Sequence, residues 1–144
     1  MRTGIELRGD DAHKDDPAGA VVFSGRSPIE IQNYIRENVK AGDPVSLNRK
    51  EKFNDGEPRI YFVIEHNGNP IGVTSSSFGA VLFSVLRINA GWKIKWPIRM
   101  EGLHVESVDT VAGLPSTSRR AGLGGCGVWL RVRVFGLGRF IYGD

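Results

Sequence analysis

Residues 128–135 alternate strictly between aliphatic side chains and basic or aromatic ones. Successive side chains of a β-strand point to opposite faces, so this period of two residues predicts a half-buried strand. The predicted buried face carries Val128, Leu130, Val132 and Val134, and the opposite face carries Trp129, Arg131, Arg133 and Phe135. The chain must therefore build a sheet with one covered face. The uncovered face of this strand is the first candidate for a binding surface.

Two helices are indicated by capping residues and periodicity. Ser27, Pro28 and Glu30 form a helix start, because serine can accept from the amide of Glu30 and proline needs no donor in the first turn. A second helix follows the serines at residues 75–77. Its apolar stripe has three-four spacing and consists of Phe78, Val81, Leu82, Val85 and Leu86.

The remaining segments are predicted to be strands and loops. Strands are expected at residues 21–23, 44–50, 60–65, 70–74 and 104–111, and loops at residues 53–58 and 112–127. In the 104–111 strand, simple alternation groups Val105, Ser107, Asp109 and Val111 on one face. We predict an α+β domain: a small antiparallel, partly closed β-barrel with two covering helices, over residues 21–144. Residues 1–20, polar and without hydrophobic period, are expected to be a flexible leader.

The composition argues against several classes of protein. The single cysteine, Cys126, allows no internal disulfide, and three scattered histidines provide no zinc-site spacing. No apolar run is long enough for a signal peptide or a membrane span. The glycine-rich residues 122–127 precede a strand, whereas a dinucleotide-binding loop opens a helix. We expect a cytoplasmic protein with no cofactor, no metal and no membrane contact.

An enzyme is the least favoured class. It would need a cleft in which His104, Asp109 and Cys126 converge, and no motif relates these three residues. We therefore predict a binding domain without catalytic residues.

The C-terminal part of the chain is strongly basic. No acidic residue lies between Asp109 and the terminal Asp144, whereas that stretch contains five arginines. Two of them, Arg119 and Arg120, fall in the predicted loop before the 128–135 strand. A basic region of this kind attracts polyanions, although a net charge of +3 also suits simple solubility.

The basic and aromatic residues allow two interpretations. Arginine can bind phosphate and an aromatic ring can stack on a base. Alternatively, the arginines of the 128–135 strand are solvated or pack along Trp129. A second cluster is better interpreted as a lid over the core, because large aromatic residues are mostly buried. Its members are Trp92, Lys93, Lys95 and Trp96.

Three segments resemble parts of a known protein family. They are residues 42–49 (GDPVSLNR), 67–72 (NGNPIG) and 77–82 (SFGAVL). They resemble the strand, hairpin and helix that follow one another in the HIRAN domain, a small β-barrel module found with helicases and chromatin-remodelling proteins. Residues 105–113 and 128–136 are similar to its closing strands. HIRAN domains bind DNA, notably single-stranded ends, with aromatic residues and a polar loop. The resemblance assigns that loop to Phe53 and Asn54, where residues 52–57 match the family signature only loosely.

We predict that the domain binds nucleic acid, DNA in the first place and RNA as an alternative, as an accessory to a helicase or nuclease. The predicted binding residues are Phe53, Asn54, Arg119, Arg120, Trp129, Arg131 and Arg133. The alternative is a protein-interaction module with no nucleic-acid role, because exposed Trp129 and Phe135 with arginines between them also suit a protein hot spot.

Overall fold

A computed structural model describes residues 4–7, 15–16, 26–54, 56–74, 78, 81–86, 94–112 and 128–143. Within these ranges, side chains are not described at residues 15–16, 28, 52–54, 57–59, 111–112 and 128–129. The strand expected at residues 21–23 lies outside the described residues.

The described strands form one antiparallel sheet in the order β1-β7-β6-β3-β4-β5-β2. They are β1 (Gly4–Leu7), β2 (Asp15–Asp16), β3 (Pro44–Asn54), β4 (Glu57–His66), β5 (Asn69–Thr74), β6 (Arg99–Ala112) and β7 (Val128–Ile141). The sheet bends until β2 at one edge contacts β7 near the other, but it does not close. The predicted α+β class, with a partly closed antiparallel barrel and two helices, is confirmed.

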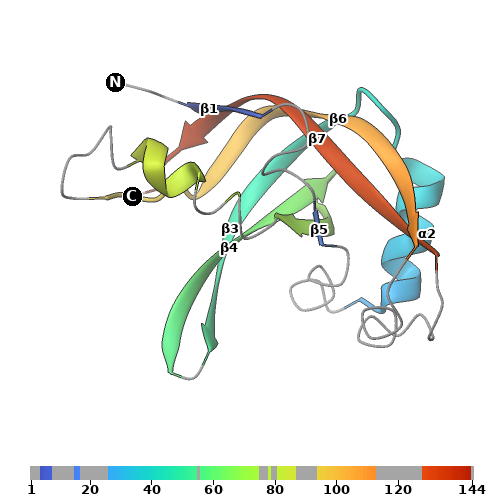
Figure 1. Cartoon of the computed structure of the whole chain (residues 1–144), viewed down its shortest axis with the longest axis horizontal. Coiled ribbons are helices and arrows are strands. Elements are labelled where there is room, and N and C mark those ends of the chain that lie inside the picture. The colour runs from blue at the N-terminus through green and yellow to red at the C-terminus, as the bar shows by residue number, and fades with distance from the viewer. Residues whose placement is uncertain are drawn as a thin grey trace.

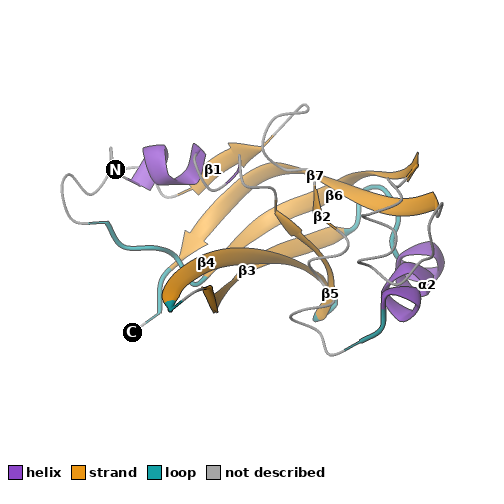
Figure 2. Ribbon diagram, turned by 60° about the horizontal axis from the view of Figure 1, so that its bottom comes forward, coloured by secondary structure: helices purple, strands orange, loops and turns teal. Residues whose placement is uncertain are grey.

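The two helices lie at opposite ends of the curved sheet (Figure 2). Helix α2 (Pro28–Asn38) begins as expected: the Ser27 hydroxyl accepts from the amide of Glu30 at 3.3 Å. Its buried face includes Ile31, Ile35 and Val39. The second helical segment includes residues 81–86 and buries Phe78, Leu82, Val85 and Leu86. Val81 was expected in that stripe, but it is 42% exposed.

Two short parts of the expected leader, residues 4–7 and 15–16, form strands. Strand β1 pairs with the end of β7, and β2 pairs with β5. Ile5 and Leu7 are buried in the core. Their alternation with Glu6 is a half-buried strand pattern too short to stand out from its polar surroundings.

The expected loop at residues 53–58 is instead the end of a long hairpin. Strand β3 continues to Asn54, β4 starts at Glu57, and the turn contains Gly56 at a φ of 81°. A glycine takes this left-handed conformation without steric cost, which permits a tight turn. The far part of the hairpin projects from the body of the sheet (Figure 1), and we call it the wing, residues 49–61.

Strands β6 and β7 form a long arch over the rest of the sheet (Figure 1). Two irregularities interrupt their pairing. At the first, β7 has one residue more than β6 between the pairs Glu101–Arg139 and Leu103–Gly136, and Gly102 is the β6 residue at this point. At the second, Glu106 is the extra residue of β6, between the pairs Val105–Val134 and Ser107–Arg133. Each bulge increases the local bend and changes which face the following side chains occupy.

Candidate nucleic-acid interface

The alternation predicted for β7 is confirmed where its side chains are described. Val132 and Val134 are fully buried, and Arg131, Arg133 and Phe135 lie on the opposite face. Phe135 is 40% exposed, while both arginines are only partly exposed. We call this surface, with Leu137 and Arg139 beyond it, the β7 outer face.

Carboxylates of β6 lie close to two arginines of the β7 outer face. Arg133 Nη2 lies 3.6 Å from Asp109 Oδ2, and its Nη1 lies 3.8 Å from Glu106 Oε1. Arg139 Nη2 lies 3.6 Å from Glu101 Oε2. Asp109 is also the β6 residue that pairs with Arg131. The stripe that looks basic in the sequence of β7 is therefore largely balanced by β6.

The bulge at Glu106 explains this charge balance. Simple alternation places Val105 and Asp109 on one face of β6, but one extra residue between them moves Asp109 to the opposite face. Val105 consequently faces the core, whereas Asp109 faces the arginines. The sequence-based grouping of Val105, Ser107 and Asp109 is wrong for this reason.

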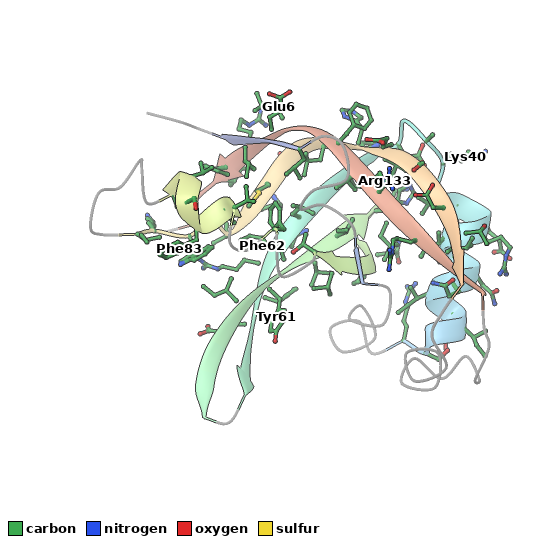
Figure 3. The ribbon with its side chains drawn as sticks, viewed as in Figure 1. Glu6, Lys40, Tyr61, Phe62, Phe83 and Arg133 are labelled. Atoms are coloured by element: carbon green, nitrogen blue, oxygen red, sulfur yellow. The ribbon has the colours of Figure 1, made fainter. Side chains whose placement is uncertain are left out.

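The predicted binding residues are not gathered on one described surface. Arg119 and Arg120 lie outside the described residues, and only the backbones of Phe53, Asn54 and Trp129 are described. Phe53 and Asn54 belong to the outer end of β3, and Trp129 to the start of β7. The wing projects away from the arch (Figure 1), and Figure 3 shows Arg133 well apart from Tyr61 on the wing.

A second surface combines aromatic rings with cations. The Trp96 ring lies 6.3 Å from that of Phe83 and 6.5 Å from that of Phe62, measured between centroids. Figure 3 shows Phe83 and Phe62 on neighbouring elements beneath the arch. Trp96 is partly buried against the core, which confirms the predicted lid for this residue. Trp92 and Lys93 lie outside the described residues.

The same surface continues to the C-terminal end of the described chain. Arg49 donates from Nη1 to the backbone oxygen of Trp96 at 2.8 Å. The Arg49 amide donates to Ile98 O at 2.9 Å, and the Ile98 amide donates to Ile141 O at 2.8 Å. Lys95 Nζ lies 5.5 Å from the ring centroid of Tyr142. We call this surface the aromatic–basic patch: Arg49, Phe83, Lys95, Trp96, Ile98 and Tyr142.

The aromatic–basic patch is accessible and positively charged. Phe83 and Tyr142 are each 43% exposed, and Lys95 and Arg49 are exposed. Burial raises the pKa of Tyr142, which keeps its phenol neutral. The acidic Glu51 follows Arg49 two residues along the same face of β3, so the cations outnumber the carboxylate. Sequence reasoning missed Phe83 and Tyr142, because only the fold brings a helix, a linker and the C-terminal segment together.

A buried polar network joins α2 to the hairpin of β4 and β5. His66 is 4% exposed; its Nε2 lies 2.9 Å from Asp43 Oδ2 and its Nδ1 lies 2.7 Å from the Tyr34 hydroxyl. Hydrogen bonds from His66 and from the Lys40 amide lower the pKa of Asp43. The order carboxylate, imidazole, hydroxyl resembles a catalytic triad. However, the Tyr34 hydroxyl donates to His66 O at 3.0 Å and accepts from Asn69 at 3.2 Å, so it is committed within the fold.

A hollow of about 410 Å³ opens where β3, β6 and the turn between β4 and β5 meet. Its lining includes two carboxylates, Glu65 and Glu101, with His104 beside them. Glu101 already lies 3.0 Å from Arg99. The hollow therefore has little uncompensated charge with which to bind an ion.

No family model, curated protein or solved structure matches the chain, so the likeness to the HIRAN domain stays a prediction. Among the described residues, no group of three or more histidine, cysteine or acidic side chains is arranged to hold a metal ion. None of the helices in the described ranges is long and apolar enough to cross a membrane. Of the residues named for a catalytic site, Cys126 lies outside those ranges, and Asp109 lies 3.6 Å from Arg133.

Proposed function

We propose that this domain binds single-stranded nucleic acid, DNA in the first place, and that the aromatic–basic patch is the main contact. The observation that carries the proposal is the combination of exposed rings at Phe83 and Tyr142 with cations at Lys95 and Arg49. Proteins that bind single strands stack bases on aromatic rings and place cations along the phosphates. Bases would stack on Phe83 and Tyr142, and phosphates would lie against Lys95 and Arg49.

The wing offers a continuation of the same path. Arg49 is the first residue of the wing, and Phe53 and Asn54 lie further along β3 in the same hairpin. A single strand of nucleic acid that leaves the aromatic–basic patch and follows β3 would reach Phe53 and Asn54. The β7 arginines are secondary contacts in this proposal, because Glu106 and Asp109 already compensate Arg133. A helicase or nuclease partner rests on the family likeness alone.

Titration of short fluorescent oligonucleotides at several salt concentrations tests the proposal. Two phosphate contacts predict a slope of about −1.4 for log affinity against log salt with single strands. Phe83→Ala should weaken binding by about 1–3 kcal/mol through the loss of one stacked base. Phe135→Ala removes an equally exposed ring from the β7 outer face and serves as the control. Binding that Phe83→Ala leaves unchanged would reject the aromatic–basic patch as the contact.

A protein-interaction module is the second candidate function, and the β7 outer face favours it. Phe135 is 40% and Leu137 is 64% exposed, and the charges around them are balanced. Exposed aromatic and aliphatic side chains surrounded by paired charges are typical of a protein-binding surface. If the domain fails to bind every oligonucleotide and Leu137→Asp abolishes association with a protein partner, this second function replaces the first.

A further inference from the structure

The wing has two outer edges that no described strand covers. The pairing of β3 with β6 ends at Asn48. The pairing of β4 with β5 begins only at Val63. Among the described residues, β3 and β4 therefore pair only with each other along the wing. The backbone groups along such an edge can hydrogen-bond to an added strand.

One hydrogen bond shows which backbone groups of β3 point outward. The Arg49 amide donates to Ile98 O, on the side away from β4, at 2.9 Å. Alternate residues of an antiparallel strand direct their amide and carbonyl groups to the same side. Glu51 and Phe53 therefore each present a donor and an acceptor at the outer edge. Among the described residues, no other backbone group bonds to them there.

The outer edge of β4 is less open. By the same register, its outward residues are Pro58, Ile60 and Phe62. Phe62 O already accepts from the Thr74 hydroxyl at 3.3 Å. Pro58 has no amide hydrogen, and proline is typical of a strand edge that does not pair further. Only Ile60 keeps both groups, so the β3 edge is the better site for an added strand.

A second copy of the chain does not fit the β3 edge. An antiparallel pair of β3 strands that opposes Glu51 to Phe53 sets the two Lys52 residues of the dimer directly against each other. A pair centred on Glu51 opposes two carboxylates, with Lys50 against Lys52 on either side. Like charges at directly opposed positions destabilise a sheet. The β3 edge therefore disfavours pairing with itself.

The charges of the wing favour an acidic partner. By register, Lys50, Lys52 and Arg59 share one face of the hairpin, and Glu57 is the acidic position of that face. Lys52 and Arg59 are direct partners across the two strands. A peptide with an acidic residue at every second position would set one carboxylate opposite Lys50 and another opposite Lys52. Such pairs of opposite charge stabilise a sheet.

We propose that the β3 edge of the wing binds an extended acidic peptide, which joins the sheet as a strand beside residues 49–54. The peptide would form about five backbone hydrogen bonds, with Glu51, with Phe53 and with the Arg49 carbonyl. Its acidic residues alternate with β-branched ones, which suit an extended chain. This site goes beyond the nucleic-acid proposal, because backbone groups of β3 hold the partner and the rings of the aromatic–basic patch take no part.

Amide hydrogen exchange, measured by NMR on the unmodified domain, tests the added strand directly. The probe is a peptide of about ten residues that alternates valine with glutamate, and its control carries lysine in place of glutamate. At saturation the acidic peptide should slow the exchange of the Glu51 and Phe53 amides by about tenfold or more, and the lysine peptide should not. Unchanged exchange of both amides would overturn the proposal.

Two further results of the exchange measurement would also overturn it. Equal protection by single-stranded oligothymidine would make the wing a nucleic-acid contact. Protection that grows with the concentration of the domain alone would make a second copy the occupant.

Proline substitutions distinguish the β3 edge from the β4 edge. Glu51→Pro removes an outward amide hydrogen of β3, and Ile60→Pro removes that of its register partner on β4. Neither hydrogen lies between the two strands, so both variants keep the bonds within the hairpin. Fluorescence anisotropy should show about tenfold weaker binding of the acidic peptide by Glu51→Pro and little change in Ile60→Pro. Equal affinities in all three proteins, or equal losses in the two variants, would overturn the assignment to the β3 edge.

Discussion

At the scale of single residues, glycine allows the arch to bend. Gly102 has a φ of 93°, and a Cβ atom built on it would lie 2.8 Å from the backbone oxygen of Leu137. Gly68, in the turn after β4, has a φ of 79° but no atom near such a Cβ. The two glycines therefore share the backbone requirement and differ in the space around them.

Gly102→Ala should destabilise the domain more than Gly68→Ala. The left-handed backbone alone costs a non-glycine residue about 1–2 kcal/mol. Contact with the backbone of β7 adds about 1–3 kcal/mol at position 102, because the opposing strand must move. Urea unfolding of the two variants measures the difference. Equal losses would show that the arch relaxes around the extra methyl group.

Asp43 makes the stability depend on acid. Its pKa is lowered in the folded domain by hydrogen bonds from His66 and from the Lys40 amide. A carboxyl with a lowered folded pKa stabilises fully above its unfolded pKa of about 3.9, and this contribution is lost as the pH falls through the lower folded value. In urea unfolding, the free energy of unfolding of Asp43→Asn should therefore fall less with decreasing pH than that of the unmodified domain. If both proteins lose stability in parallel below about pH 4, the contribution of Asp43 is contradicted.

At the scale of elements, one side chain joins α2 to β7. Gln32 is 6% exposed; its Nε2 donates to Leu130 O at 3.2 Å, and its Oε1 accepts from the Leu130 amide at 2.7 Å. The amide side chain thus pairs with the backbone as a neighbouring strand would. This contact lies on the part of β7 that precedes its pairing with β1.

Gln32→Ala should destabilise the domain by about 1–3 kcal/mol, because two backbone groups of Leu130 lose their partners. Asn33→Ala is the matched control, since Asn33 is the next residue of α2 and is exposed. It should change the free energy of unfolding by less than about 0.5 kcal/mol. Chemical unfolding compares the two, and similar effects would mean that the contact with β7 contributes little.

At the scale of the whole molecule, the distribution of charge matters more than its sum. The net charge is +3, yet Arg133 and Arg139 of the β7 outer face lie beside carboxylates, whereas the two cations of the aromatic–basic patch outnumber Glu51. Electrostatic attraction of a polyanion depends on this local pattern. Of the two surfaces compared, the one with more arginines is therefore the one whose charges are more nearly balanced.

Replacing both carboxylates near Arg133, in Glu106→Gln with Asp109→Asn, should release the β7 arginines for phosphate binding. We expect tighter oligonucleotide binding, and a salt slope steeper by about 0.7 for each phosphate gained. Glu37→Gln with Glu65→Gln changes the net charge equally at other sites and is the control. If both double variants bind equally tightly, net charge alone governs the affinity.

The sequence by itself determined the α+β class, helix α2 with its serine cap, the hairpin at Asn67–Gly68 and the buried valines of β7. These features depend on local periodicity and turn chemistry, which act over a few residues. Only the tertiary structure decided the charge of the β7 outer face, because one extra residue at Glu106 turned Asp109 toward the arginines. It also decided the aromatic–basic patch and the His66 network, whose members come from segments far apart in the chain. Contacts of that kind depend on strand register and bend, which alternation alone does not encode.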